Sequence, residues 1–102
     1  MPANPNLIVN GDFSAGNTGF TSDFVYVAPN RKFETIEGEY SIVTDPGTQF
    51  ANKYAKYGDH TSGTGAMLFV DGDNTGAFWR DSVSLAANTT YAFTYFVTAA
   101  DT

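Results

Sequence analysis

Apolar and polar side chains alternate with a period of two in every periodic segment of this 102-residue chain. The clearest case is residues 90–98, in which aromatic and valine side chains alternate with threonine and alanine, interrupted by Phe96. Such alternation places apolar side chains on one face of an extended strand, whereas a helix would repeat every three to four residues. Segments of this kind, bounded by glycine, asparagine or aspartate turns, predict strands at 7–9, 24–28, 39–44, 66–70, 77–85 and 90–98.

Length and composition agree with a small β domain. A chain of this length forms a single domain. Aromatic residues make up 16% of it, with nine Phe and six Tyr, and such side chains suit a pleated, half-buried surface. The predicted fold is therefore an all-β, antiparallel jelly-roll sandwich over residues 1–102. The side chains expected in its core are Val9, Phe13, Ile42, Leu68, Val70, Val83, Leu85, Tyr91, Phe93 and Tyr95, with Ser41 pointing outward.

The charge balance narrows the possible partners. Five Lys and Arg stand against eleven Asp and Glu, which gives a net charge of −6. A chain this acidic has no basic patch for phosphates, so nucleic-acid binding is disfavoured. No apolar run approaches the roughly 20 residues of a membrane-spanning helix, so membrane insertion is not expected. The absence of cysteine excludes disulfides, cysteine-based zinc sites and thiol nucleophiles.

Three segments carry a family resemblance. Residues 6–13 read NLIVNGDF, residues 58–72 read GDHTSGTGAMLFVDG, and residues 79–93 run from Trp79 through VSL to NTTYAF. In this order they resemble the galactose-binding-like jelly rolls, which include the family 4, 9 and 22 carbohydrate-binding modules and domains of bacterial exoproteins, some of the PEP-CTERM type. The resemblance implies a domain that binds a polysaccharide or other glycan outside the cell or at its surface.

In that family, further strands follow the one that matches residues 90–98. Here this segment contains no Pro or Lys, and no charge follows it before Asp101, so its edge is open to pairing. We expect the domain to lack its final strands. Either downstream strands or a strand from a neighbouring subunit would then complete the sheets by β-augmentation.

The resemblance also implies a structural calcium ion. Asp71 and Asp73 belong to the turn sequence DGDN, and Asp12 follows the first predicted strand, so these three are the candidate metal ligands. Ser14 stands where many family members have a glutamate that binds calcium. The alternative interpretation is that these aspartates are present because turns favour them.

Glycan sites combine aromatic rings, which stack on sugar rings, with polar groups that bind hydroxyls. Tyr54 and Tyr57 are the better exposed candidates, because they lie in the longest irregular stretch, residues 48–64. Core packing competes for Trp79, which has the same parity as Val83 and Leu85. The full set of candidate ligand-binding residues is Tyr54, Tyr57, Asp59, Trp79 and Arg80, with Tyr26, Phe50 and Asn52 as further possibilities.

The sequence gives no reason to expect an enzyme. His60 lies between Asp59 and Thr61, but adjacent side chains in an extended loop diverge and cannot form an oriented relay. Scattered turn carboxylates also do not predict the paired acids of a glycosidase cleft.

Two functions remain open at this stage. The first is a non-catalytic, extracellular carbohydrate-binding or adhesion module. The second is a structural subunit of a surface layer, an extracellular fibre or a virion, built from jelly-roll domains and joined to its neighbours by strand pairing.

Overall fold

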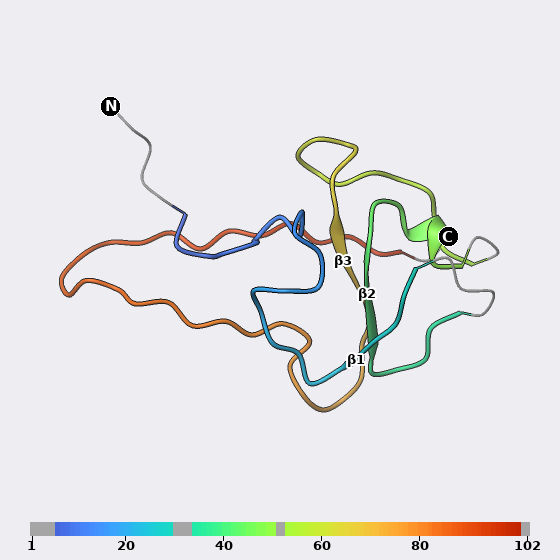
Figure 1. The fold of residues 1–102 in the computed structure, drawn as a ribbon, viewed down its shortest axis with the longest axis horizontal. Helices are drawn as coiled ribbons and strands as arrows, with labels where there is room; N and C mark the ends of the chain where they lie inside the picture. The colour runs from blue at the N-terminus through green and yellow to red at the C-terminus, as the bar shows by residue number, and fades with distance from the viewer. Residues whose placement is uncertain (1–5, 30–33, 51–52, 101–102) are drawn as a thin grey trace.

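The computed structural model describes residues 6–29, 34–50 and 53–100. Three strands, β1 (Val25–Tyr26), β2 (Glu39–Val43) and β3 (Met67–Asp71), form one sheet in the order β1-β2-β3 (Figure 1). Within these residues, the helical structure is limited to the 3₁₀ turn η1 (Pro46–Thr48), which Asp45 caps by accepting from the Gly47 amide. The all-β class that the sequence predicts is confirmed.

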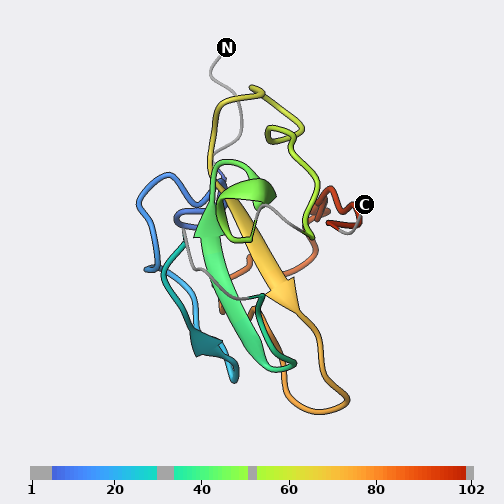
Figure 2. The same cartoon turned by 90° about the vertical axis from the view of Figure 1, so that its right-hand side faces the viewer.

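The ladder between β2 and β3 is the main element of the sheet. Its antiparallel register runs from Glu39 opposite Asp71 to Val43 opposite Met67, and Figure 2 shows the two strands side by side. β1 joins the other edge of β2 in parallel. These strands fall within or beside the predicted segments 24–28, 39–44 and 66–70, which are therefore confirmed as strands.

One face of the ladder carries the hydrophobic core. Val43 and Phe69 share this face, because residues opposite each other and residues two apart point the same way. The ring of Tyr54 packs edge-on against Phe69 with centroids 4.8 Å apart. Val43, Tyr54 and Phe69 are all buried and form one cluster. Ser41 lies on this same face and is fully buried, which contradicts its predicted outward position.

The opposite face of β2 is covered by rings from segments that precede it. Tyr40 is buried and contacts Phe20 and Tyr26 edge-on, with centroids 6.0 and 5.5 Å away. Its hydroxyl donates to the Asn17 side-chain oxygen at 2.6 Å. Both faces of this strand are thus used for packing, so its alternation does not separate a core side from a solvent side.

A hydrogen-bonded chain connects the core to the end of β3. Thr35 is buried and donates to Asp71 Oδ2 at 3.1 Å. Its oxygen lies 2.8 Å from the Tyr54 hydroxyl. Because the single Thr35 proton is directed to Asp71, the Tyr54 hydroxyl is left to donate to Thr35.

The remaining predicted strands join no sheet in the part of the chain that the structure describes, although Arg80 forms an isolated bridge with Thr21. Residues 7–9 enter a turn, and residues 77–85 and 90–98 form no ladder with each other or with the sheet among the described residues. Residues 81–98, which we call the aromatic arm, extend from the rest of the molecule as two legs joined at a turn (Figure 1). We call the described residues outside the arm the body. Within the described chain the strands make a single sheet, and the jelly-roll sandwich stays a prediction.

This arrangement overturns much of the predicted core. A period of two shows which side chains share a face, but it does not show whether a second sheet covers that face. Four of the predicted residues, Phe13, Ile42, Leu68 and Val70, are half-buried. The other six are exposed: Val9, Val83, Leu85, Tyr91, Phe93 and Tyr95.

Two buried hydroxyls provide a matched test of the core. Thr35→Val removes a hydroxyl that bonds to both Tyr54 and Asp71, and should lower the free energy of unfolding by about 1–3 kcal/mol. Ser41→Ala removes a buried hydroxyl that has no hydrogen-bond partner, and should change it by no more than about 0.5 kcal/mol or stabilise the protein. Urea unfolding at one protein concentration measures both. Equal losses for the two variants would show that the Tyr54–Thr35–Asp71 chain does not form.

Candidate functional site

The predicted ligand residues do not converge on one cavity. The sequence predicts an exposed Tyr54, but this side chain is only 5% exposed because Phe69 packs against its ring and Thr35 binds its hydroxyl. The prediction that Tyr54 is an exposed ligand-binding residue is therefore wrong about its exposure. Phe50, 6.4 Å from Tyr54, belongs to the same cluster, while Asn52 lies outside the described residues.

Tyr57 is half-buried and has a structural role. Its hydroxyl donates to the carbonyl of Ala99 at 3.2 Å. Burial, followed by the nearby Asp45 carboxylate, raises the pKa of the Tyr57 hydroxyl. The neutral Tyr57 hydroxyl therefore connects Ala99 to the loop that follows η1 by a hydrogen bond that it donates.

Asp59 organises the loop that it precedes. Its carboxylate accepts from the Ser62 hydroxyl and the Gly65 amide, both at 2.7 Å, and from the Thr61 and Ser62 amides at 3.2 and 3.1 Å. These bonds, led by the Ser62 hydroxyl, hold the pKa of Asp59 far below its usual value. Since four donors already occupy its two oxygens, Asp59 acts in this structure as the centre of a turn.

Arg80 is held at the root of the aromatic arm. Its guanidinium donates to both carboxylate oxygens of Asp23, at 3.2 and 2.9 Å. The Arg80 and Thr21 backbones form a two-bond antiparallel bridge beside it. Asp23 also accepts from the Ala77 amide at 2.8 Å. The hydrogen bonds from Arg80 lower the pKa of Asp23 and raise that of Arg80, so the pair stays charged.

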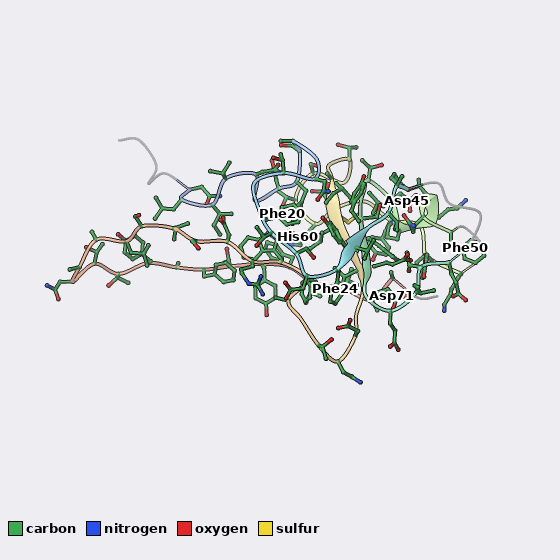
Figure 3. The ribbon with its side chains drawn as sticks, turned by 60° about the horizontal axis from the view of Figure 1, so that its bottom comes forward. Phe20, Phe24, Asp45, Phe50, His60 and Asp71 are labelled. Atoms are coloured by element: carbon green, nitrogen blue, oxygen red, sulfur yellow. The ribbon has the colours of Figure 1, made fainter. Side chains whose placement is uncertain are left out.

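The other leg of the arm is fixed where it returns to the body. The Ala55 amide donates to the Ala100 carbonyl at 2.7 Å. The ring of His60 stacks on Phe96 with centroids 3.5 Å apart and planes 9° apart. Figure 3 shows His60 and Phe20 at the end of the body from which the arm projects, and Asp45 and Phe50 at the opposite end. His60 therefore contacts the arm by stacking.

Trp79 begins a row of rings that the sequence interpretation divided between core and ligand site. Trp79 is half-buried and lies 6.3 Å from the ring of Phe93, which in turn lies 5.9 Å from Tyr95. We call Trp79, Phe93 and Tyr95 the aromatic row. Phe93 and Tyr95 are exposed. The sequence shows that Phe93 and Tyr95 share a parity, but it does not show that Trp79 approaches them from the body, just before the arm begins.

Two open depressions lie apart from this row. One, of about 350 Å³, is at the arm root and is lined by Gly19, Phe20, Thr21, Arg80, Asp81 and Ser82. The other, of about 220 Å³, adjoins Tyr54, Asp71 and Ala100. Arg80 and Tyr54, both predicted to bind one ligand, thus line different depressions. Tyr26, a further predicted candidate, is exposed and contacts Tyr40 edge-on.

The predicted calcium ligands are engaged with their own surroundings. Asp12 accepts from the Ser14 amide and hydroxyl at 3.0 and 2.7 Å, Asp73 accepts from the Thr75 amide at 2.9 Å, and Asp71 accepts from Thr35. The described residues contain no group of three or more His, Cys, Asp or Glu that could hold a metal ion. Calcium usually binds six to eight oxygens, and these residues do not form such a set. Calcium binding stays a prediction.

Comparison with known proteins adds no relative. No protein-family model matches the chain, and neither a curated protein nor a solved structure matches it. The resemblance to galactose-binding-like jelly rolls therefore remains a prediction. Among the described residues, no helix is long and apolar enough to cross a membrane.

The Asp59 turn makes a specific prediction. Asp59→Ala should raise amide hydrogen exchange at Ser62 and Gly65 several-fold, because their acceptor is removed. Asp73→Ala removes the same charge from another turn and is the matched control. In the wild type, the pKa of Asp59 is lowered, so the ionised carboxylate stabilises the folded turn. This stabilisation is complete above the ordinary pKa of 3.8 and is lost progressively as the pH falls below that value. Unchanged exchange in Asp59→Ala would show that the carboxylate does not hold the turn.

Proposed function

We propose that this chain is a non-catalytic carbohydrate-binding module and that the aromatic row is its sugar-stacking surface. The observation that carries the proposal is the spacing of three rings: Trp79, in the body just before the arm, lies 6.3 Å from Phe93, and Phe93 lies 5.9 Å from Tyr95 on the exposed arm. Aromatic rings give binding surfaces a large apolar area at a low cost in side-chain entropy. Three adjacent rings offer such an area to successive units of a polysaccharide.

The surroundings of the row favour a neutral glycan. Residues 82–98, which carry Phe93 and Tyr95, contain no charged side chain, and Arg80, which follows Trp79, is paired with Asp23. The exposed Ser82, Ser84 and Asn88 provide hydroxyl and amide groups on the same arm. Rings flanked by uncharged donors and acceptors match the alternation of apolar faces and hydroxyls on a neutral sugar chain better than they match a charged ligand.

The proposal places the chain in a galactose-binding-like jelly-roll domain of an extracellular or cell-surface protein that adheres through glycans. The NLIVNGDF, GDHTSGTGAMLFVDG and NTTYAF segments support it. Within this proposal Asp59 and Arg80 shape the loop and the arm root, while Tyr54 belongs to the core.

A structural subunit of a surface layer, fibre or virion is the second candidate function. The open backbone of residues 90–98 favours it, because such a subunit would use an unpaired strand to join its neighbour.

Retention on immobilised neutral polysaccharides tests the first proposal. The wild-type chain should be retarded in affinity electrophoresis, and the double variant Phe93→Ser, Tyr95→Ser should lose most of that retardation because two of the three stacking rings are gone. Val83→Ser, Leu85→Ser is the matched control, since it removes two exposed apolar side chains from the other leg without removing a ring. Equal retardation of both variants, or none for the wild type across a panel of polysaccharides, would contradict the proposal.

Calcium is tested separately by thermal unfolding. If Asp12, Asp71 and Asp73 bind calcium, the melting temperature should rise on adding calcium chloride and return to its starting value with a chelator. Asp12→Asn should abolish the rise, whereas Asp81→Asn, a carboxylate outside the predicted set, should not. A melting temperature that is indifferent to calcium would contradict the prediction of a structural ion.

A further inference from the structure

The arm exposes a continuous length of unpaired backbone. Among the described residues, none of the backbone amides or carbonyls of residues 90–98 has a hydrogen-bond partner. Pro, Lys and inward-pointing charges, which protect natural sheet edges, are absent from residues 82–98. Water satisfies an exposed backbone of this kind, and a second extended strand can replace that water, because a strand presents donors and acceptors at the same repeat.

We infer that two copies of this chain pair through residues 90–98, antiparallel and in a register centred on Thr94. In this register the Phe93 side chain lies opposite the partner subunit's Tyr95, and Tyr91 lies opposite the partner subunit's Val97. Aromatic–aromatic and aromatic–β-branched pairs are among the cross-strand pairs that stabilise antiparallel sheets. The segment is therefore complementary to itself, as a two-fold symmetric interface requires.

Charge and exposed apolar side chains support a second copy as the occupant. The chain carries a net charge of −6, but no charged side chain lies between Asp81 and Asp101, so no like charges face each other within the paired strands. Pairing would pack the exposed apolar side chains of the two copies edge to edge and cover part of their surface, with Tyr91, Phe93, Tyr95 and Val97 on one face of the strand and Phe96 on the other. Their exposed fractions are 44% for Tyr91, 63% for Phe93, 73% for Tyr95, 67% for Phe96 and 83% for Val97.

Pairing and glycan stacking use different directions of the same strand. Backbone groups point along the sheet, whereas side chains stand roughly perpendicular to it. The centred register puts the Phe93 and Tyr95 rings of both copies on one face, so pairing would enlarge the stacking surface. This last consequence rests on the proposed function, whereas the pairing itself does not.

The oligomeric state of the 102-residue chain tests the pairing. Light scattering during gel filtration should show a dimer whose population rises with protein concentration. Thr94→Lys should make the chain monomeric, because the register places the two lysines directly opposite each other. Thr94 lies on the opposite face of the strand from Phe93 and Tyr95, so this substitution leaves the rings of the aromatic row unchanged. Thr89→Lys adds the same charge outside the paired segment and should leave the dimer intact. A wild-type chain that is monomeric at every concentration, or a dimer indifferent to Thr94→Lys, would overturn the inference.

Two further variants test the register and the identity of the partner. Mixing Thr94→Lys with Thr94→Glu should restore a dimer that contains one chain of each, and failure to do so would overturn the centred register. The chain has no cysteine, so Thr94→Cys introduces a single thiol. Directly opposed residues have Cα atoms about 4.5–5.5 Å apart, within the range of a disulfide. Thr94→Cys should therefore form a covalent dimer on mild oxidation and Thr89→Cys should not. Equal cross-linking at both positions would contradict the register.

The glycan assay separates this inference from the proposed function. Monomeric Thr94→Lys retains all three rings of the aromatic row, so it should still be retarded by the polysaccharide that retards the wild type, though more weakly. A wild-type chain that forms the dimer but is not retarded would contradict glycan binding and leave the pairing intact. A wild-type chain that is retarded but monomeric would contradict the pairing and leave glycan binding intact.

Discussion

The packing of Tyr54 against Phe69 is the contact on which the body of this protein depends. It joins the irregular chain after η1 to the face of the β2–β3 ladder and, through Thr35, to Asp71 at the end of β3. A small chain buries few side chains, so one aromatic contact of this kind carries a large share of the stability. Its loss would separate the loop from the sheet and expose Phe69.

Within the described residues the arm, unlike the body, is held at its two ends only and is not packed along its length. Its root is fixed by the Arg80–Asp23 pair and the bridge to Thr21, and its return by His60 stacked on Phe96. Between these points it presents rings and open backbone to solvent. Anchoring both ends while leaving the middle uncovered gives the arm a defined direction and an available surface, which suits binding better than packing.

Local patterns in the sequence predicted the ladder but not what covers it. Residues 39–44 and 66–70 were identifiable because alternation and flanking turns are properties of neighbouring residues. The burial of Tyr54 was missed because Phe69 and Thr35 reach it from distant segments. The same is true of residues 90–98. Their alternation shows which side chains share a face, but it does not show that no second sheet covers that face in the structure. The aromatic row could likewise not be predicted, because Trp79 joins it from the body, just before the arm begins.

Hydrogen exchange of the backbone amides tests the exposed, unpaired arm most directly. At high dilution, the amides of β2 and β3 should exchange slowly, while those of residues 90–98 should exchange at nearly the rates of an unstructured peptide. Raising the protein concentration should slow exchange in residues 90–98 alone, as pairing protects them. Slow exchange of residues 90–98 at every dilution would mean that this strand is packed within a sheet of its own chain, and would contradict the account.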